Sequence, residues 1–167
     1  EVPDSSLFGM GESAPVFAAA SALLAADLGT EIVQIDMGGW DTHSAQGTLD
    51  GRFAGLLAEL DAGIGALVDR HMGSGDGLVI TVMTEFGRRV KENASGGTDH
   101  GRGGLALVIG DGVDGGLKGT WPGLAELDAG DVPAVNDLRA VQAEVAAAAL
   151  GSDAATPGDS APLGLFA

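Results

Sequence analysis

The stretch LVITVM, residues 78–83, decides the fold class that the sequence predicts. It is a short, almost continuously apolar run rich in β-branched residues, which is typical of a strand covered on both faces. A second run of this kind, LALVI, occupies residues 105–109, and the shorter EIVQID occupies residues 31–36. We therefore expect three parallel strands.

Helices are expected between and around these runs. Apolar side chains recur at helical spacing over residues 14–28, before Gly29, and over residues 48–72, before the glycine-rich break at residues 73–77. A further helix is expected over residues 137–150, with a cap at Gly151. Because a strand, a helix and a strand in this order predict a right-handed parallel crossover, the fold class expected is α/β, with a parallel sheet flanked by helices.

The length of 167 residues suggests one domain, which we place at residues 1–151, with a surface tail at residues 152–167. The apolar runs resemble central strands, yet few elements are available to cover them. We therefore expect an incomplete domain, which a missing amino-terminal portion or a partner chain would complete.

Charge and composition exclude several classes of binding partner for this chain. Eight basic residues against 24 acidic ones give a net charge of −16, which argues against binding to nucleic acid or to an anionic membrane surface. No apolar run approaches the ~18 residues that a membrane span needs. Because the chain has no cysteine, any metal must be held by Asp, Glu, His or carbonyl groups.

Two loops that follow predicted strands carry paired aspartates and histidines. Asp41 and His43 lie in GGWDTHS, and Asp99 and His100 lie in NASGGTDHGRGG. Each aspartate alone is more often a turn residue than a ligand. The carboxyl ends of parallel strands meet at one sheet edge, however, so we predict that these four residues bind a divalent metal ion, such as zinc, manganese or calcium.

The second loop also contains Glu85 and Arg88, in TEFGR. Arg88 is a candidate for binding an anionic substrate, or it pairs with Glu85 or Glu92. Glu85 is either a carboxylate that orients Arg88 or a histidine, or a structural residue. Trp40 and Phe86 are possible anchors for the two loops.

Six separated motifs carry a family resemblance over residues 31–151, in the order GGWDTH, TEFGR, ENASGGTDHG, LVIGDGVDGG, TWPGL and NDLR. This pattern resembles the carboxyl-terminal half of the bacterial family called domain of unknown function 1501. The resemblance implies the alkaline-phosphatase-like superfamily, together with sulfatases and phosphodiesterases. Many family members carry a twin-arginine export signal, which implies a periplasmic or extracellular location.

The resemblance also implies roles for single residues. The Asp-His-Gly motif of the superfamily, which supplies two metal ligands, is similar to Asp99, His100 and Gly101, and its second Asp/His pair corresponds to Asp41 and His43, at a shorter spacing. No histidine follows His100, so one of the family's ligands has no counterpart. The nucleophile normally lies in the amino-terminal half, and we therefore name none.

The function expected from these observations is a metal-dependent hydrolase module that acts on phosphate or sulfate esters in an exported protein. The alternative is a non-catalytic binding or assembly module that keeps the metal for stability.

Overall fold

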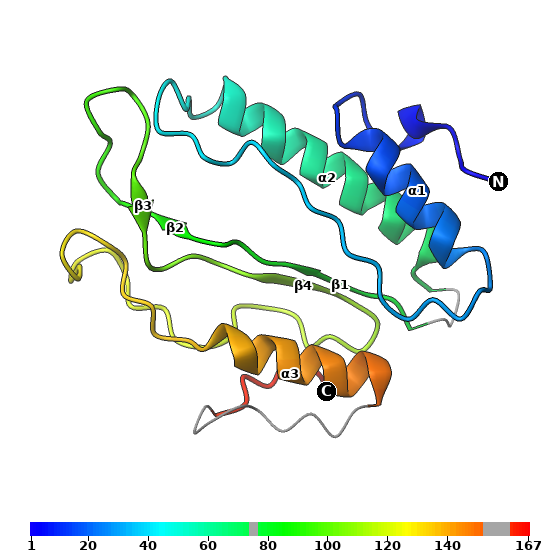
Figure 1. Ribbon diagram of the computed structural model, residues 1–167. Helices are drawn as coiled ribbons and strands as arrows, with labels where there is room; N and C mark the ends of the chain where they lie inside the picture. The colour runs from blue at the N-terminus through cyan, green and yellow to red at the C-terminus, as the bar shows by residue number, and fades with distance from the viewer. Residues whose placement is uncertain (74–76, 152–160) are drawn as a thin grey trace. The chain divides into compact units, whose positions relative to one another are not determined.

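The three helices expected from the sequence are present in the computed structural model, and each is slightly shorter than its apolar pattern (Figure 1). They are α1 (Ala14–Leu24), α2 (Arg52–His71) and α3 (Leu138–Leu150), and a 3-10 helix, η1 (Ser5–Phe8), precedes them. Backbone geometry sets several of these ends. Gly51 has a φ of 94° and stops α2 from starting earlier, and Gly151 ends α3 in the left-handed region at φ 60°.

The structure describes residues 1–73, 77–151 and 161–167. These residues form two compact units, Glu1–Asp76 with Ala94–Gly97, and Gly77–Asn93 with Thr98–Ala167. Parts of two predicted segments, the glycine-rich break at residues 73–77 and the tail at residues 152–167, lie outside the described residues. The end of the tail is described, and there Leu165 is buried while Phe166 forms an antiparallel bridge with Val113.

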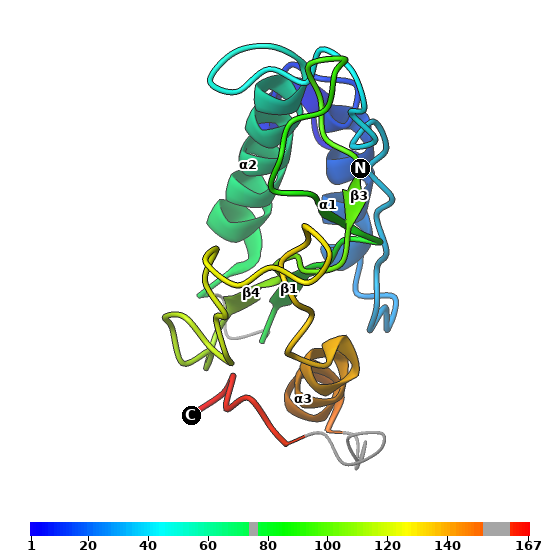
Figure 2. The same ribbon diagram turned by 90° about the vertical axis from the view of Figure 1, so that its left-hand side faces the viewer.

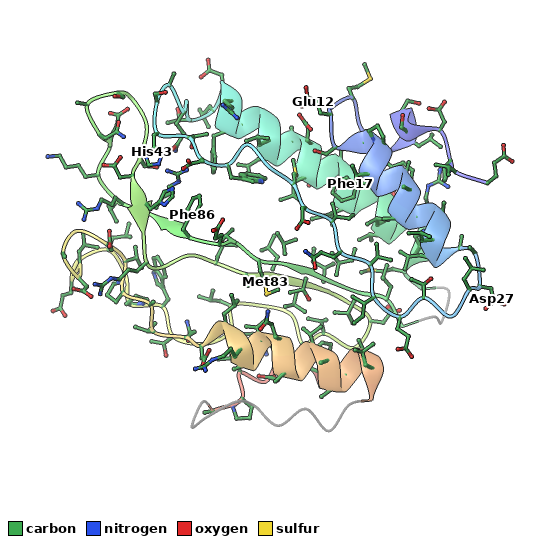
Figure 3. All side chains as sticks on the ribbon, viewed as in Figure 1. Glu12, Phe17, Asp27, His43, Met83 and Phe86 are labelled. Atoms are coloured by element: carbon green, nitrogen blue, oxygen red, sulfur yellow. The ribbon has the colours of Figure 1, made fainter. Side chains whose placement is uncertain are left out.

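The first unit is helical, with α1, α2 and η1 packed against one another. Phe17 of α1 is 4% exposed, and Figure 3 shows it on the side of α1 that faces α2. Gly63 of α2 makes this approach possible, because a Cβ there would lie 2.4 Å from the Phe17 ring. His71, at the end of α2, lies 2.8 Å through its Nε2 from the Oγ of buried Ser21.

The described residues of the second unit include four short strands. β1 (Val79–Val82) pairs with β4 (Leu107–Gly110) in register from Val79 with Gly110 to Val82 with Leu107, and β2 (Gly87–Arg88) pairs with β3 (His100–Gly101). Both pairs are antiparallel. α3 contacts β1 and lies along one side of the β1–β4 pair (Figure 2).

The expected parallel sheet flanked by helices is therefore wrong. Two of the three apolar runs do form strands, but they are antiparallel partners, because the chain between them doubles back through β2 and β3 without a crossover helix. Residues 31–36 form no strand with any of the described residues. The four residues of β1 are only partly buried, so β1 is also not a fully covered central strand.

Among the described residues, no helix combines the length and the apolar character that crossing a membrane requires.

Candidate metal centre

The loop that carries Asp41 and His43 belongs to the first unit and is anchored by its buried members. The Trp40 ring packs edge-on against Phe53, with centroids 6.0 Å apart. Thr42 is 3% exposed, and its Oγ1 donates to Gln46 Oε1 at 2.9 Å. Asp41 and His43 flank Thr42, so their side chains turn outward, and they are 60% and 45% exposed. The Asp41 Oδ1 and His43 Nε2 atoms lie 2.9 Å apart.

A distant segment, Ala94–Gly97, holds this loop in place. Ala45 N donates to Ser95 O at 3.0 Å, and Gln46 N donates to Gly96 O at 2.9 Å. A Cβ on Gly97 would lie 2.3 Å from the carbonyl carbon of His43, so only glycine permits this backbone approach. The backbone beneath His43 therefore depends on a residue more than fifty positions away in the sequence.

His100 lies in the second unit, on β3, opposite Arg88 of β2. Its imidazole stacks on the Phe86 ring, with centroids 3.8 Å apart and planes 12° from parallel. The Arg88 guanidinium carbon lies 4.9 Å from the centroid of the same ring, and Arg88 Nη1 donates to the carbonyl of Thr98. These contacts fix the orientation of the His100 ring and place a positive charge beside it.

The glycines of the TEFGR and TDHG motifs allow the β2–β3 pair to form. A Cβ on Gly87 would lie 1.9 Å from the carbonyl oxygen of Gly103, and one on Gly101 would lie 2.6 Å from the carbonyl carbon of Arg88. The glycines of these two motifs therefore allow the backbone segments around His100 to lie in close contact.

The remaining candidates occupy other surroundings. Asp99 is exposed, and its Oδ1 accepts from Asn93 Nδ2 at 3.0 Å while its carbonyl accepts from Arg89 N at 3.0 Å. Glu85 is exposed. The metal-binding role of Asp99 and the orienting role of Glu85 remain predictions.

Asp41 and His43 in the first unit, and His100 in the second, each offer one atom that could bind a metal ion. Chain connectivity alone limits how far His100 lies from the loop. Gly97 touches the His43 backbone, and His100 follows Gly97 by three residues, so the Cα of His100 lies within roughly 11 Å of the Gly97 Cα.

Comparison with known protein families places this chain. The model of the family described as "Protein of unknown function (DUF1501)" matches residues 7–153. The chain belongs to the DUF1501 family. No curated protein and no solved structure matches this DUF1501 chain. The match confirms the resemblance to the family itself, and it extends upstream to include α1 as well as both loops. The resemblance to the carboxyl-terminal half of the family and to the alkaline-phosphatase-like superfamily stays a prediction.

Sequence reasoning missed the residues that support the site in this DUF1501 chain. Gly97 and buried Thr42 carry no metal-binding signal of their own, because their role is to pack and to hydrogen-bond. Phe86 was expected only as a loop anchor, whereas it is the stacking partner of His100. The three-residue spacing from Gly97 to His100 is the one feature of the sequence that could have linked the two loops.

Proposed function

We propose that Asp41, His43 and His100 bind one divalent metal ion and that this DUF1501 chain is a metal-dependent hydrolase module for phosphate or sulfate esters. The observation that carries the proposal is the Asp41–His43 pair, which is fixed beside Gly97 in the first unit and tethered through three residues to His100. A periplasmic or extracellular setting, which follows from the family resemblance, is part of the same proposal.

The chemistry of the donors supports a particular class of metal. One carboxylate and two imidazoles suit zinc or manganese better than calcium, which takes six to eight oxygen ligands. Three protein ligands also leave a coordination position open, as in catalytic zinc sites. Two ligand atoms that share one tetrahedral zinc ion lie roughly 3.4 Å apart, so the 2.9 Å contact between Asp41 and His43 would open by about half an ångström.

Arg88 supports the choice of an anionic substrate. It is the cross-strand partner of His100, and the Thr98 carbonyl and the Phe86 ring hold its guanidinium in place. A guanidinium binds the oxygens of a phosphoryl or sulfuryl group through paired hydrogen bonds. Since the net charge of the chain is −16, attraction of an anion must come from this local charge and from the metal.

A bound divalent ion would polarise the ester oxygens and lower the pKa of a coordinated water from its high value in bulk water towards about 7. The chain would contribute the ligands, a stacking surface that orients His100, and a guanidinium for the substrate oxygens. Thr42 is hydrogen-bonded and buried, so it is not placed to act as a nucleophile.

Zinc titration of matched histidine variants tests the metal site. The wild-type chain should bind one zinc ion, and His43→Ala or His100→Ala should lower the zinc affinity at least about tenfold. Even the loss of a residue that only hydrogen-bonds to a metal ligand usually lowers metal affinity by about this factor. The control is His71→Gln, because His71 contacts Ser21 in the helical unit and is not one of the three candidate ligands. Equal zinc affinity in all four proteins would refute the site.

Turnover of an aryl phosphate and an aryl sulfate then tests the reaction. Metal-dependent hydrolysis that is lost in Asp41→Asn and weakened in Arg88→Lys would support the hydrolase. The alternative, a non-catalytic module stabilised by metal, is favoured by the hydrogen bonds that join the Asp41 loop to residues 94–97, because a metal there would reinforce a contact between distant segments. Zinc binding that raises the melting temperature without any turnover would select this alternative.

A further inference from the structure

A cavity of about 490 Å³ lies within the first unit, in the range of volumes that small-molecule sites occupy. It is formed by the start of α1, the first half of α2 and residues 35–39, which have no regular secondary structure. Its apolar wall consists of Val16, Ile35, Met37 and Leu56. None of its lining residues is a candidate metal ligand, so the cavity is separate from the proposed metal centre.

Unpaired charges of opposite sign line this cavity. Glu12, in the turn between η1 and α1 (Figure 3), and Arg52, at the first position of α2, both contribute to the lining. Neither forms a hydrogen bond or an ion pair with any residue that the structure describes. The lining holds two further carboxylates, and both already accept hydrogen bonds. Glu59 Oε2 accepts from Ser13 Oγ at 3.0 Å and from Ser13 N at 3.3 Å, and Asp36 Oδ1 accepts from Gln34 Nε2 at 3.0 Å.

The position of Arg52 is limited by its neighbours. Gly39 has a φ of 93°, and a Cβ there would lie 3.4 Å from Arg52 Nη2 and 3.2 Å from Leu56 Cδ2. The guanidinium therefore lies near the Gly39 backbone and beside the apolar wall. The cavity thus presents a cation, a separate carboxylate and an aliphatic surface to the same space.

We propose that this cavity binds a small zwitterion with an aliphatic side chain, either a free amino acid or a short peptide. The carboxylate of the ligand would accept paired hydrogen bonds from Arg52, its ammonium group would donate to Glu12, and its side chain would pack on Val16, Ile35 and Leu56. A ligand of this kind neutralises both unpaired charges at once, whereas an ion of a single charge leaves one of them unpaired. The inference does not depend on the proposed metal site.

Matched probes test each charge separately with the full chain. Isothermal titration would compare L-leucine and L-leucylglycine with isoamylamine, which lacks the carboxylate, and with 4-methylpentanoate, which lacks the amine. We expect leucine, the dipeptide or both to bind at least about tenfold more tightly than either single-charge analogue. A tenfold difference in affinity is about the effect of losing one hydrogen bond to a charged group. The relative affinity of leucine and leucylglycine identifies which of the two sources of the zwitterion fits.

Two charge-removing variants assign the contacts. Arg52→Gln should reduce binding of the zwitterion to the level of isoamylamine, and Glu12→Gln should reduce it to the level of 4-methylpentanoate. Asp69→Asn, an exposed neutralisation on α2 that does not line the cavity, should leave the affinity unchanged, and circular dichroism would verify that each variant is folded. The proposal is overturned if neither zwitterion binds at about 10 mM, ten times the dissociation constant of a millimolar complex. It is equally overturned if folded Arg52→Gln and Glu12→Gln bind as the wild type does.

Discussion

Replacing Gly63 with alanine tests the packing of the helical unit. Gly63 is buried in the middle of α2, and the added Cβ would lie 2.4 Å from two carbons of the Phe17 ring and 2.7 Å from a third. Carbon atoms in contact normally lie about 3.5–4.0 Å apart, so the ring or the helix must move by roughly 1.1 Å or more. Phe17 is 4% exposed and surrounded by core residues, so it has little room to move.

Two opposing effects decide the size of the change. Overpacking a filled core costs about 1–3 kcal/mol, while alanine in a helix interior is favoured over glycine by about 1 kcal/mol. Gly65, in the same helix, gives the matched control, because no atom lies within 4 Å of the Cβ that alanine would add there. Gly65→Ala gains the helix preference without the clash, so it should be the more stable variant by about 1–3 kcal/mol.

Thermal and urea unfolding of the two variants measures this difference directly. In a protein of this size 1 kcal/mol corresponds to roughly 2–4 °C in melting temperature, so the two variants should melt several degrees apart. If Gly63→Ala proves as stable as Gly65→Ala, then Phe17 does not pack against α2 at Gly63, and the arrangement of the helical unit described above is wrong.

Three further substitutions test local features of the chain. Gly87→Ala should disrupt the β2–β3 pair, because its Cβ would lie 1.9 Å from the Gly103 carbonyl oxygen, and zinc affinity should fall with the loss of the strand that presents the third ligand. Asp137→Ala should destabilise the protein by about 1 kcal/mol in urea unfolding, since the Asp137 carboxylate caps the first turn of α3. The Ser6 N–H, which donates to the Asp4 carboxylate, lowers the pKa of Asp4. Asp4 should therefore stabilise the folded state above its unfolded pKa, and its advantage over Asp4→Asn in thermal melting should vanish as the pH falls through the lowered folded pKa.

The types of ligand in the candidate site could be predicted from the sequence, but the contacts that hold these ligands in place could not. Pairs of Asp and His in glycine-rich loops indicated a metal, and Asp41 and His43 do lie together, with Oδ1 and Nε2 2.9 Å apart. The sequence could not indicate that Ala94–Gly97 supports the loop of Asp41 and His43. The contact is made by backbone hydrogen bonds, which do not depend on a pattern of side chains. It also could not indicate that Phe86 stacks on His100, since their contact follows from the pairing of β2 with β3.

The sequence by itself determined the helices, two strands and the family of this protein. Apolar spacing and end residues such as Asp137 and Gly151 act within a few positions, so they fix α1, α2 and α3 locally. Only the tertiary structure decided how the strands pair. An apolar run indicates how much of a strand is buried, but its N–H and C=O groups can form hydrogen bonds in either a parallel or an antiparallel ladder. The direction of β4 against β1 was therefore set by the path of the chain through β2 and β3, and residues 31–36 form no strand in the described part of the chain.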